Sequence, residues 1–207
     1  MDLFLRYLWE NPRLFFSAAV IVCFSICCHE FMHAFAALKF GDDTAANRGH
    51  LTLNPLRQMG IVSLIMFCLV GIAWGQVPVD LRKLRGRFAP ALVALAGPLT
   101  NLIVGFLFLA GAFLLVRNFG ESFALQMLCY GGILNYLLFI LNLLPIPGLD
   151  GGAVVQNFLP QLNWDRAEWS KGLLFFLILA LFAGFDYLWG AAEFLAQQTL
   201  SLLARVF

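Results

Sequence analysis

Charged side chains are scarce in this sequence. Of its 207 residues, 12% are charged and 61% are apolar. A soluble domain carries about 25% charged residues, so the composition excludes an ordinary soluble protein. The net charge is only +1, which excludes the strongly basic surface of a nucleic-acid-binding protein. Internal repeats and low-complexity segments are also missing, so a single domain over residues 1–207 is expected.

The sequence also lacks the signals of a secreted or thiol-based protein. Its five cysteines lie in apolar segments without CxxC spacing, which predicts free, buried thiols rather than disulfides or a thiolate metal site. The N-terminal residues MDLFLRYLWENPR contain no apolar core followed by a small-residue cleavage site. We therefore expect no cleavable signal peptide, and the first apolar helix is expected to direct insertion.

Long apolar runs are abundant instead. Residues 88–116 and 122–149 contain no charged side chain, and about 20 helical residues cross a hydrocarbon core of roughly 30 Å. The sequence thus predicts an all-α polytopic membrane protein with about four to six membrane helices. The expected apolar segments are 14–38, 60–75, 88–116, 122–144 and 172–190, with a further C-terminal stretch over 191–207.

Two polar connections are expected to carry short membrane-associated β-strands. Residues 39–59 predict a loop with a strand around His50 to Leu53. Residues 76–87 form a basic connection that opens with Gln76, Val77, Pro78 and Val79. An exposed strand edge there can bind an extended substrate, although a plain connector explains the segment equally well.

His29, Glu30 and His33 form an HExxH motif inside the first apolar segment. Helical positions i and i+4 share a face, so both imidazoles can reach one zinc ion while Glu30 activates a water. Each ionisable group in a membrane helix costs about 2.5–3.5 kcal/mol. The alternative, two histidines merely paired with Glu30, would leave these costs without a function.

A catalytic zinc site needs a third protein ligand. Asp150 is the best candidate, because the prolines and glycines around it let the backbone leave helical geometry and turn a carboxylate inward. An ordinary helix stop explains the same run about as well. The other acidic residues in or near apolar segments are Asp42, Asp43, Asp186 and Glu193.

HEFMHA followed by NLLPIPGLDGG resembles the site-2 protease family of intramembrane zinc metalloproteases. The stretch AGPLTN resembles the family's Gly-Pro-x-x-Asn segment, and KFGD, LTLNPL and QVPV are similar to a compact prokaryotic branch without PDZ or nucleotide-sensing domains. The resemblance covers roughly residues 20–160. Arg57-Gln58-Met59-Gly60 departs from a His-x-Asp-Pro pattern that is common in relatives.

The resemblance implies one zinc ion per chain, with His29, His33 and Asp150 as ligands and Glu30 as the catalytic glutamate. Asn142 matches an asparagine that contacts the substrate or the oxyanion. Asn101 matches the asparagine of the Gly-Pro segment and is assigned to the same substrate or oxyanion role. The implied catalytic core is about 14–160, followed by C-terminal helices within 172–207.

The shared metal constrains the topology. His33 lies near the end of the first apolar segment and Asp150 lies beyond the end of the fourth, so both ends must face the same side of the membrane. This requires residues 60–75 to re-enter rather than span. The active-site side then carries nine basic residues against four, which predicts a multi-pass cell-membrane protein with its active site towards the cytoplasm.

The predicted function is an intramembrane zinc endopeptidase that cleaves within or near transmembrane segments. Its expected partners are transmembrane proteins or signal-peptide remnants and the lipid bilayer, without nucleic acid. Two alternatives remain at this point. A metal transporter would use the same ligands, usually with more than one site, and a catalytically inactive zinc-binding scaffold would not need Glu30 as a base.

Overall fold

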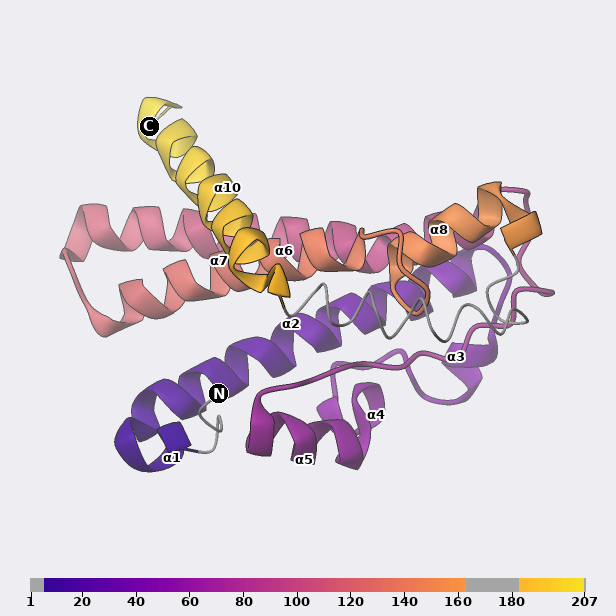
Figure 1. The fold of residues 1–207 in the computed structure, drawn as a ribbon, viewed down its shortest axis with the longest axis horizontal. Helices are drawn as coiled ribbons and strands as arrows, with labels where there is room; N and C mark the ends of the chain where they lie inside the picture. The colour runs from indigo at the N-terminus through magenta and orange to yellow at the C-terminus, as the bar shows by residue number, and fades with distance from the viewer. Residues whose placement is uncertain (1–5, 163–182, 207) are drawn as a thin grey trace.

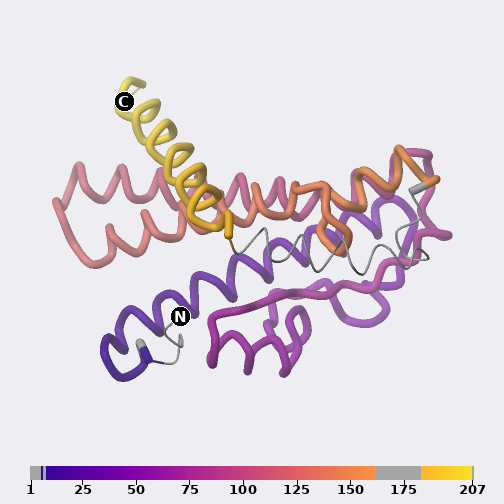
Figure 2. The backbone as a smooth tube through the Cα atoms, in the orientation of Figure 1, coloured from indigo at the N-terminus to yellow at the C-terminus, as the bar shows by residue number. Residues whose placement is uncertain are grey.

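The computed structural model describes residues 6–162 and 183–206, and nearly all of its regular structure is helical (Figure 1). The backbone path in Figure 2 shows long helices lying side by side, with a shorter helical unit and an extended segment along one of them. The elements are α1 (Tyr7–Glu10), α2 (Pro12–Lys39), α3 (Thr44–Asn47), α4 (Pro55–Gln58), α5 (Gly60–Val70), α6 (Ala89–Phe119), α7 (Phe123–Asn142), α8 (Asp150–Phe158), the 3₁₀ helix η2 (Pro160–Leu162) and α10 (Phe185–Val206).

Three of the described helices are long and apolar enough to cross a membrane: α2, α6 and α7, with 28, 31 and 20 residues. At 1.5 Å per residue they measure about 42, 46 and 30 Å. Local signals set their starts, since Asn11 caps α2 through Leu14 N and Ser122 caps α7 through Leu125 N. The all-helical fold with apolar helices of membrane-spanning length is confirmed for the described residues. The count of four to six membrane helices stays a prediction, and residues 172–182 of the fifth segment lie outside the described residues.

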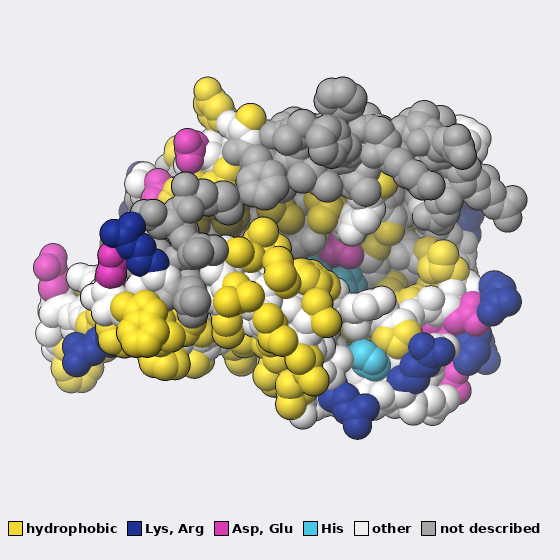
Figure 3. Space-filling model, turned by 60° about the horizontal axis from the view of Figure 1, so that its bottom comes forward, with side chains coloured by type: hydrophobic (Ala, Val, Ile, Leu, Met, Phe, Trp, Pro, Cys, Tyr) yellow, Lys and Arg dark blue, Asp and Glu magenta, His cyan; other side chains and the backbone are white. Residues whose placement is uncertain are grey.

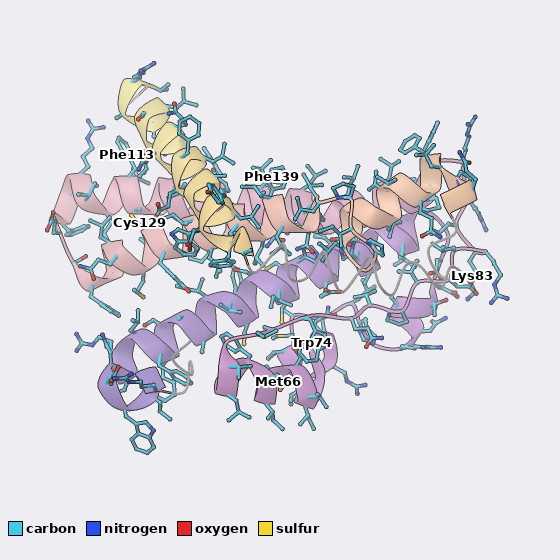
Figure 4. All side chains as sticks on the ribbon, viewed as in Figure 1. Met66, Trp74, Lys83, Phe113, Cys129 and Phe139 are labelled. Atoms are coloured by element: carbon cyan, nitrogen blue, oxygen red, sulfur yellow. The ribbon has the colours of Figure 1, made fainter. Side chains whose placement is uncertain are left out.

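Helix α5 is too short to span. Its 11 residues measure about 16 Å, and Gly71 ends it in the left-handed conformation at φ 79°. The chain then returns in extended form beside α2, so that Trp74 lies near α5 and Lys83 lies at the far end of the return (Figures 1 and 4). The chain thus turns back after α5, and the re-entry of residues 60–75 into a membrane stays a prediction.

The predicted β-strands are not formed in the described part of the chain. Residues 50–53 and 76–79 carry no strand assignment. The return segment is extended, but it is held by single anchors rather than by a partner strand: Trp74 N donates to Ser63 Oγ, and Gln76 N donates to Gln58 O. A ladder needs a second strand, and none of the described segments supplies one here.

The C-terminal helix packs across α6 and α7. Leu109, Tyr136 and Leu137 form a buried cluster with Ala192 and Ala196 of α10. Helix α10 is continuous from Phe185 to Val206, so residues 191–206 of the C-terminal stretch form one helix with the end of the fifth apolar segment. It is not among the three candidate membrane spans.

Large apolar side chains cover much of the outer surface. On α5, Ile61, Val62 and Ile65 are 53–68% exposed, and Figure 3 shows apolar side chains gathered over the middle of the molecule. Isolated exposed apolar residues are normal, but a continuous apolar face on a water-soluble monomer is not. This surface fits a protein surrounded by lipid chains.

Candidate metal centre

Helix α2 carries His29, Glu30 and His33 on a face that is buried against α6. Each of the three side chains is 7–8% exposed. The two imidazole rings meet edge to face, with centroids 4.6 Å apart and Nε2 atoms 2.9 Å apart. The spacing of four residues thus produces the convergence that the sequence predicted.

The outer ring nitrogens fix the tautomers of both histidines. His33 Nδ1 lies 2.7 Å from the carbonyl oxygen of Val93, and His29 Nδ1 lies 2.5 Å from Oδ1 of Asn101. Because both oxygens are acceptors, each Nδ1 must donate its proton. Each neutral imidazole therefore keeps a lone pair on Nε2, so both Nε2 atoms can bind one metal ion.

Asp150 completes the group. Its Oδ2 lies 3.1 Å from His29 Nε2, and its Oδ1 lies 3.3 Å from His33 Nε2. Ligands about 2.0–2.1 Å from a tetrahedral zinc ion lie about 3.3 Å from one another, so the three side chains fit that ion. Among the described residues this is the one group of three metal-ligating side chains that converge.

The turn before α8 explains why the aspartate is followed by two glycines. Asp150 is the first residue of α8, after Gly148 with φ +90°. A Cβ atom on Gly151 or Gly152 would overlap with the backbone carbonyls of residues 143–146. The Asp-Gly-Gly sequence thus lets the first turn of α8 pack directly on the end of α7, and this packing turns the carboxylate towards α2.

Gly97 allows α6 to approach the two histidines. A Cβ atom at this position would overlap with Nε2 of both His29 and His33. The glycine of the Gly-Pro segment is therefore required by space at the metal centre. Gly75 has the same relation to Glu30, because a Cβ there would overlap with the Glu30 carboxylate.

A cavity of about 410 Å³ opens beside these residues. Its lining includes the three candidate ligands, Glu30, Asn142 and the return segment. Figure 3 shows histidine and acidic side chains at the bottom of a hollow next to the apolar face. Asn142 Nδ2 donates to Leu138 O at 3.0 Å, and the residue borders the cavity as its predicted role requires.

A buried chain of polar side chains lies behind His29. Asn101 Nδ2 donates to Asn135 Oδ1 at 3.0 Å, and Asn135 Nδ2 donates to Ser25 Oγ at 2.8 Å. All three side chains are 0% exposed. The sequence placed Asn101 near the substrate, whereas the structure has its Oδ1 hold the His29 ring. Asn135 and Ser25 were missed, although an asparagine within an apolar run is a recognisable signal.

The return segment alternates between two sides. Gly75, Val77 and Val79 line the metal cavity, whereas Gln76 and Pro78 line a second pocket behind it. The even positions hold the segment to the protein: Gln76 N donates to Gln58 O, and Pro78 has no N–H to satisfy. Among the described residues, the N–H groups of Val77 and Val79 have no hydrogen-bond acceptor, so the odd positions form a free edge.

Acidic side chains fasten the far end of this segment. Asp42 is 0% exposed and accepts from Thr44 N and Asp80 N. Burial acts to raise the pKa of Asp42, but these hydrogen bonds outweigh it and leave the pKa below its ordinary value. Hydrogen bonds from Arg82 hold the pKa of Asp80 at about 2. Asp43 pairs with Lys83 at 2.7 Å, and this ion pair lowers the pKa of Asp43.

Several curated proteins are similar to this chain in sequence. The chain is 35% identical to "Putative zinc metalloprotease YwhC" of Bacillus subtilis, over 100% of this chain and 98% of that protein. It is 37% identical to "Putative zinc metalloprotease Rip2" of Mycolicibacterium smegmatis and 36% identical to the Rip2 protein of Mycobacterium tuberculosis. These alignments cover 76% and 77% of this chain, and 63% and 64% of the two relatives.

No family model and no solved structure matches the chain. The Bacillus alignment nevertheless extends over both proteins almost from end to end, and it includes the HExxH helix and the Leu-Asp-Gly turn that meet at one point in the structure. The chain therefore belongs to the site-2 protease family of zinc metalloproteases.

Proposed function

We propose that this chain is an intramembrane zinc endopeptidase that cleaves peptide bonds within or near transmembrane segments of other proteins. The observation that carries the proposal is the position of the candidate centre. His29, His33 and Asp150 meet between helices long and apolar enough to span a bilayer, and Glu30 lies in the same cavity.

A zinc ion bound by these three side chains would act as a Lewis acid. It would polarise the carbonyl of the scissile peptide bond and lower the pKa of the attacking water. The chain's own residues supply the rest. The Glu30 carboxylate accepts a proton from the attacking water and delivers it to the leaving amine nitrogen. Gly75 leaves room for that carboxylate to face the cavity.

Asn142 is placed to serve the developing oxyanion. It borders the cavity near the end of α7, and its Nδ2 uses one hydrogen atom on Leu138 O. The second hydrogen atom of that amide can donate to the carbonyl oxygen of the scissile bond. Donors of this kind typically contribute about 2.7–4 kcal/mol to transition-state stabilisation. Asn101 acts from behind, by keeping the His29 ring oriented.

The free edge of residues 76–79 is the proposed substrate-binding strand. A membrane helix satisfies its own backbone hydrogen bonds, so it must unwind locally before a carbonyl is accessible. The N–H groups of Val77 and Val79 can then pair with the unwound peptide, as in other cases of strand addition. The even positions keep the edge fixed through Gln76 N and Asp80 N.

The active site is proposed to open towards the cytoplasm of a prokaryotic cell. Lys39, Arg48 and Arg57 follow the end of α2 nearest the centre, and Arg82 and Lys83 lie on the adjacent connection. The positive-inside rule places such a cluster on the cytoplasmic side. Arg166 and Lys171, which the sequence assigned to the same side, lie outside the described residues.

Neither alternative function gains support. A metal transporter would usually show more than one intramembrane metal site, and the described residues contain one converging group. An inactive scaffold would not require a carboxylate beside the ligands, yet Glu30 lies in the cavity. Substrates are proposed to be transmembrane proteins or signal-peptide remnants.

The test is cleavage by the full chain in lipid vesicles, with one single-span protein and one signal-peptide remnant as substrates. Mass spectrometry of the products locates the cut, and zinc is measured in every preparation. We expect the wild type to cut within or beside the apolar segment, and Glu30→Gln to keep zinc and give no product. Cuts confined to water-exposed regions, or equal cleavage by Glu30→Gln, would overturn the proposal.

A further inference from the structure

A second pocket lies on the opposite side of the return segment from the metal cavity. It has a volume of about 220 Å³, and Arg48, His50, Arg57, Gln58 and Gln76 are among its lining residues. None of the residues that line it is acidic. The pocket can hold the volume of about seven water molecules, which is enough for a phosphate group with a small polar substituent.

The positive charge of this pocket is not neutralised within the described part of the chain. No ion pair involves Arg48 or Arg57 there, whereas the acidic side chains nearby in sequence are engaged elsewhere. Asp43 pairs with Lys83, Asp80 pairs with Arg82, and Asp42 accepts from backbone N–H groups. Two exposed guanidinium groups beside one small pocket favour an anion, and guanidinium geometry suits phosphate oxygens.

Two buried polar atoms at the pocket point to the rest of the ligand. Gln58 is 0% exposed, and its Nε2 donates to the carbonyls of His50 and Thr52. Its Oε1 has no hydrogen-bond partner, and neither has His50 Nδ1. Gln58 Oε1 is an acceptor, so a ligand that carries a hydroxyl or ammonium donor beside its anionic group would satisfy it.

The apolar surface beside the pocket indicates that the ligand is a lipid. Leu53 and Leu56 are 50% and 58% exposed immediately before the pocket, and Ile61 and Val62 are 66% and 68% exposed immediately after it. Polar pocket and apolar surface thus adjoin, as headgroup and acyl chains do in a phospholipid. Basic pockets at this level of membrane proteins bind anionic headgroups.

We propose that this pocket binds the headgroup of an anionic phospholipid of the phosphatidylglycerol type. Arg48 and Arg57 hold the phosphodiester, and a glycerol hydroxyl donates to Gln58 Oε1. Gln76 and Pro78 form one wall, so the headgroup contacts the back of the segment whose other side lines the metal cavity. This inference does not depend on zinc or on proteolysis.

The experiment measures retention of labelled phosphatidylglycerol by the full chain in phosphatidylcholine nanodiscs. Arg48→Gln with Arg57→Gln is compared with a pair outside the pocket, Arg85→Gln with Arg87→Gln, because neither of these control arginines forms an ion pair within the described residues, whereas Arg82 is paired with Asp80. We expect about 30-fold weaker retention for the pocket pair and less than about threefold for the control pair. An unchanged elution volume in size-exclusion chromatography shows that each variant is folded, and each single pocket variant repeats the test.

Equal losses of lipid retention in both pairs would show that general surface charge causes the effect, and would overturn the proposed site. An unchanged pocket pair would do the same. Soluble glycerol phosphate is the second probe, because it has the same phosphate and hydroxyl groups without acyl chains. If it displaces the lipid at equal concentration, the site takes a soluble phosphate ester and the lipid assignment is wrong.

Discussion

The two walls of the metal cavity are built differently. The helical wall places His29 and His33 on α2, where their Nδ1 atoms donate buried hydrogen bonds to Asn101 Oδ1 and Val93 O. The opposite wall is the extended segment 72–80, which is anchored at alternate positions and free at the others. The helical wall is therefore preorganised for a metal ion. The extended wall leaves backbone N–H groups available to bind a peptide.

The largest expected effect comes from closing the gap between α6 and the histidines. Gly97→Ala places a methyl group on both Nε2 atoms, so we expect zinc affinity to fall by more than about 100-fold. Competition with a chelator measures this. The matched control is Gly111→Ala in the same helix, where the added Cβ meets only Leu128 at 3.8 Å. Normal zinc binding by Gly97→Ala would show that α6 does not enclose the metal centre.

The buried polar chain behind His29 should give the next largest effect. Asn135→Leu removes the acceptor of Asn101 Nδ2, which frees the Asn101 amide to rotate. Loss of support behind a metal-binding histidine typically lowers metal affinity by 10–100-fold. Asn118→Leu is the control, because Asn118 is exposed on α6 and bonds only Leu114 O. Identical zinc affinities in the two variants would show that the buried polar side chains contribute only packing and do not support His29.

The extended wall should affect the substrate and leave the metal unchanged. Val77→Pro removes an N–H from the free edge, so we expect kcat/KM to fall by about tenfold, equivalent to the loss of one hydrogen bond of about 1.4 kcal/mol, with zinc content unchanged. Pro78→Ala alters the anchored side and should leave kcat/KM within about twofold. Equal effects of both variants would argue against pairing at the odd positions.

The smallest effect concerns the anchor at the end of that wall. Asp42 has a lowered pKa in the folded protein, so its contribution to stability is present above the pKa of the unfolded chain and is lost as pH falls through the folded value. Asp42→Asn should lower the thermal midpoint by a few degrees at pH 7 and weaken its dependence on acidic pH. Thermal unfolding in detergent between pH 7 and pH 3 measures both. If the thermal midpoint of Asp42→Asn depended on pH in the same way as that of the wild type, Asp42 would not be the anchor of the extended wall.

The sequence predicted most accurately those features that depend on a single local pattern, such as an apolar run or a helical spacing. Uninterrupted apolar runs gave α2, α6 and α7 within a few residues, and the spacing of His29 and His33 gave their shared face. Asp150 was predicted from the turn chemistry around it and from the family resemblance, and the structure brings it to the histidines.

The remaining features depend on contacts that no local pattern encodes. Strands were predicted at 50–53 and 76–79 from composition, but a strand needs a partner, and partners are set by the fold. Asn101 was assigned to the substrate because its motif matched, whereas its partner His29 lies 72 residues away. The space that requires Gly97 to be a glycine also exists only after α6 packs on α2.

The most direct test of the account is zinc X-ray absorption on the purified chain, because it reports the atoms around the metal. The account predicts two imidazole nitrogens and a carboxylate oxygen at about 2.0–2.2 Å, with one zinc ion per chain and loss of the oxygen ligand in Asp150→Ala. A sulfur ligand at about 2.3 Å from neighbouring cysteines, or an unchanged spectrum in Asp150→Ala, would contradict it.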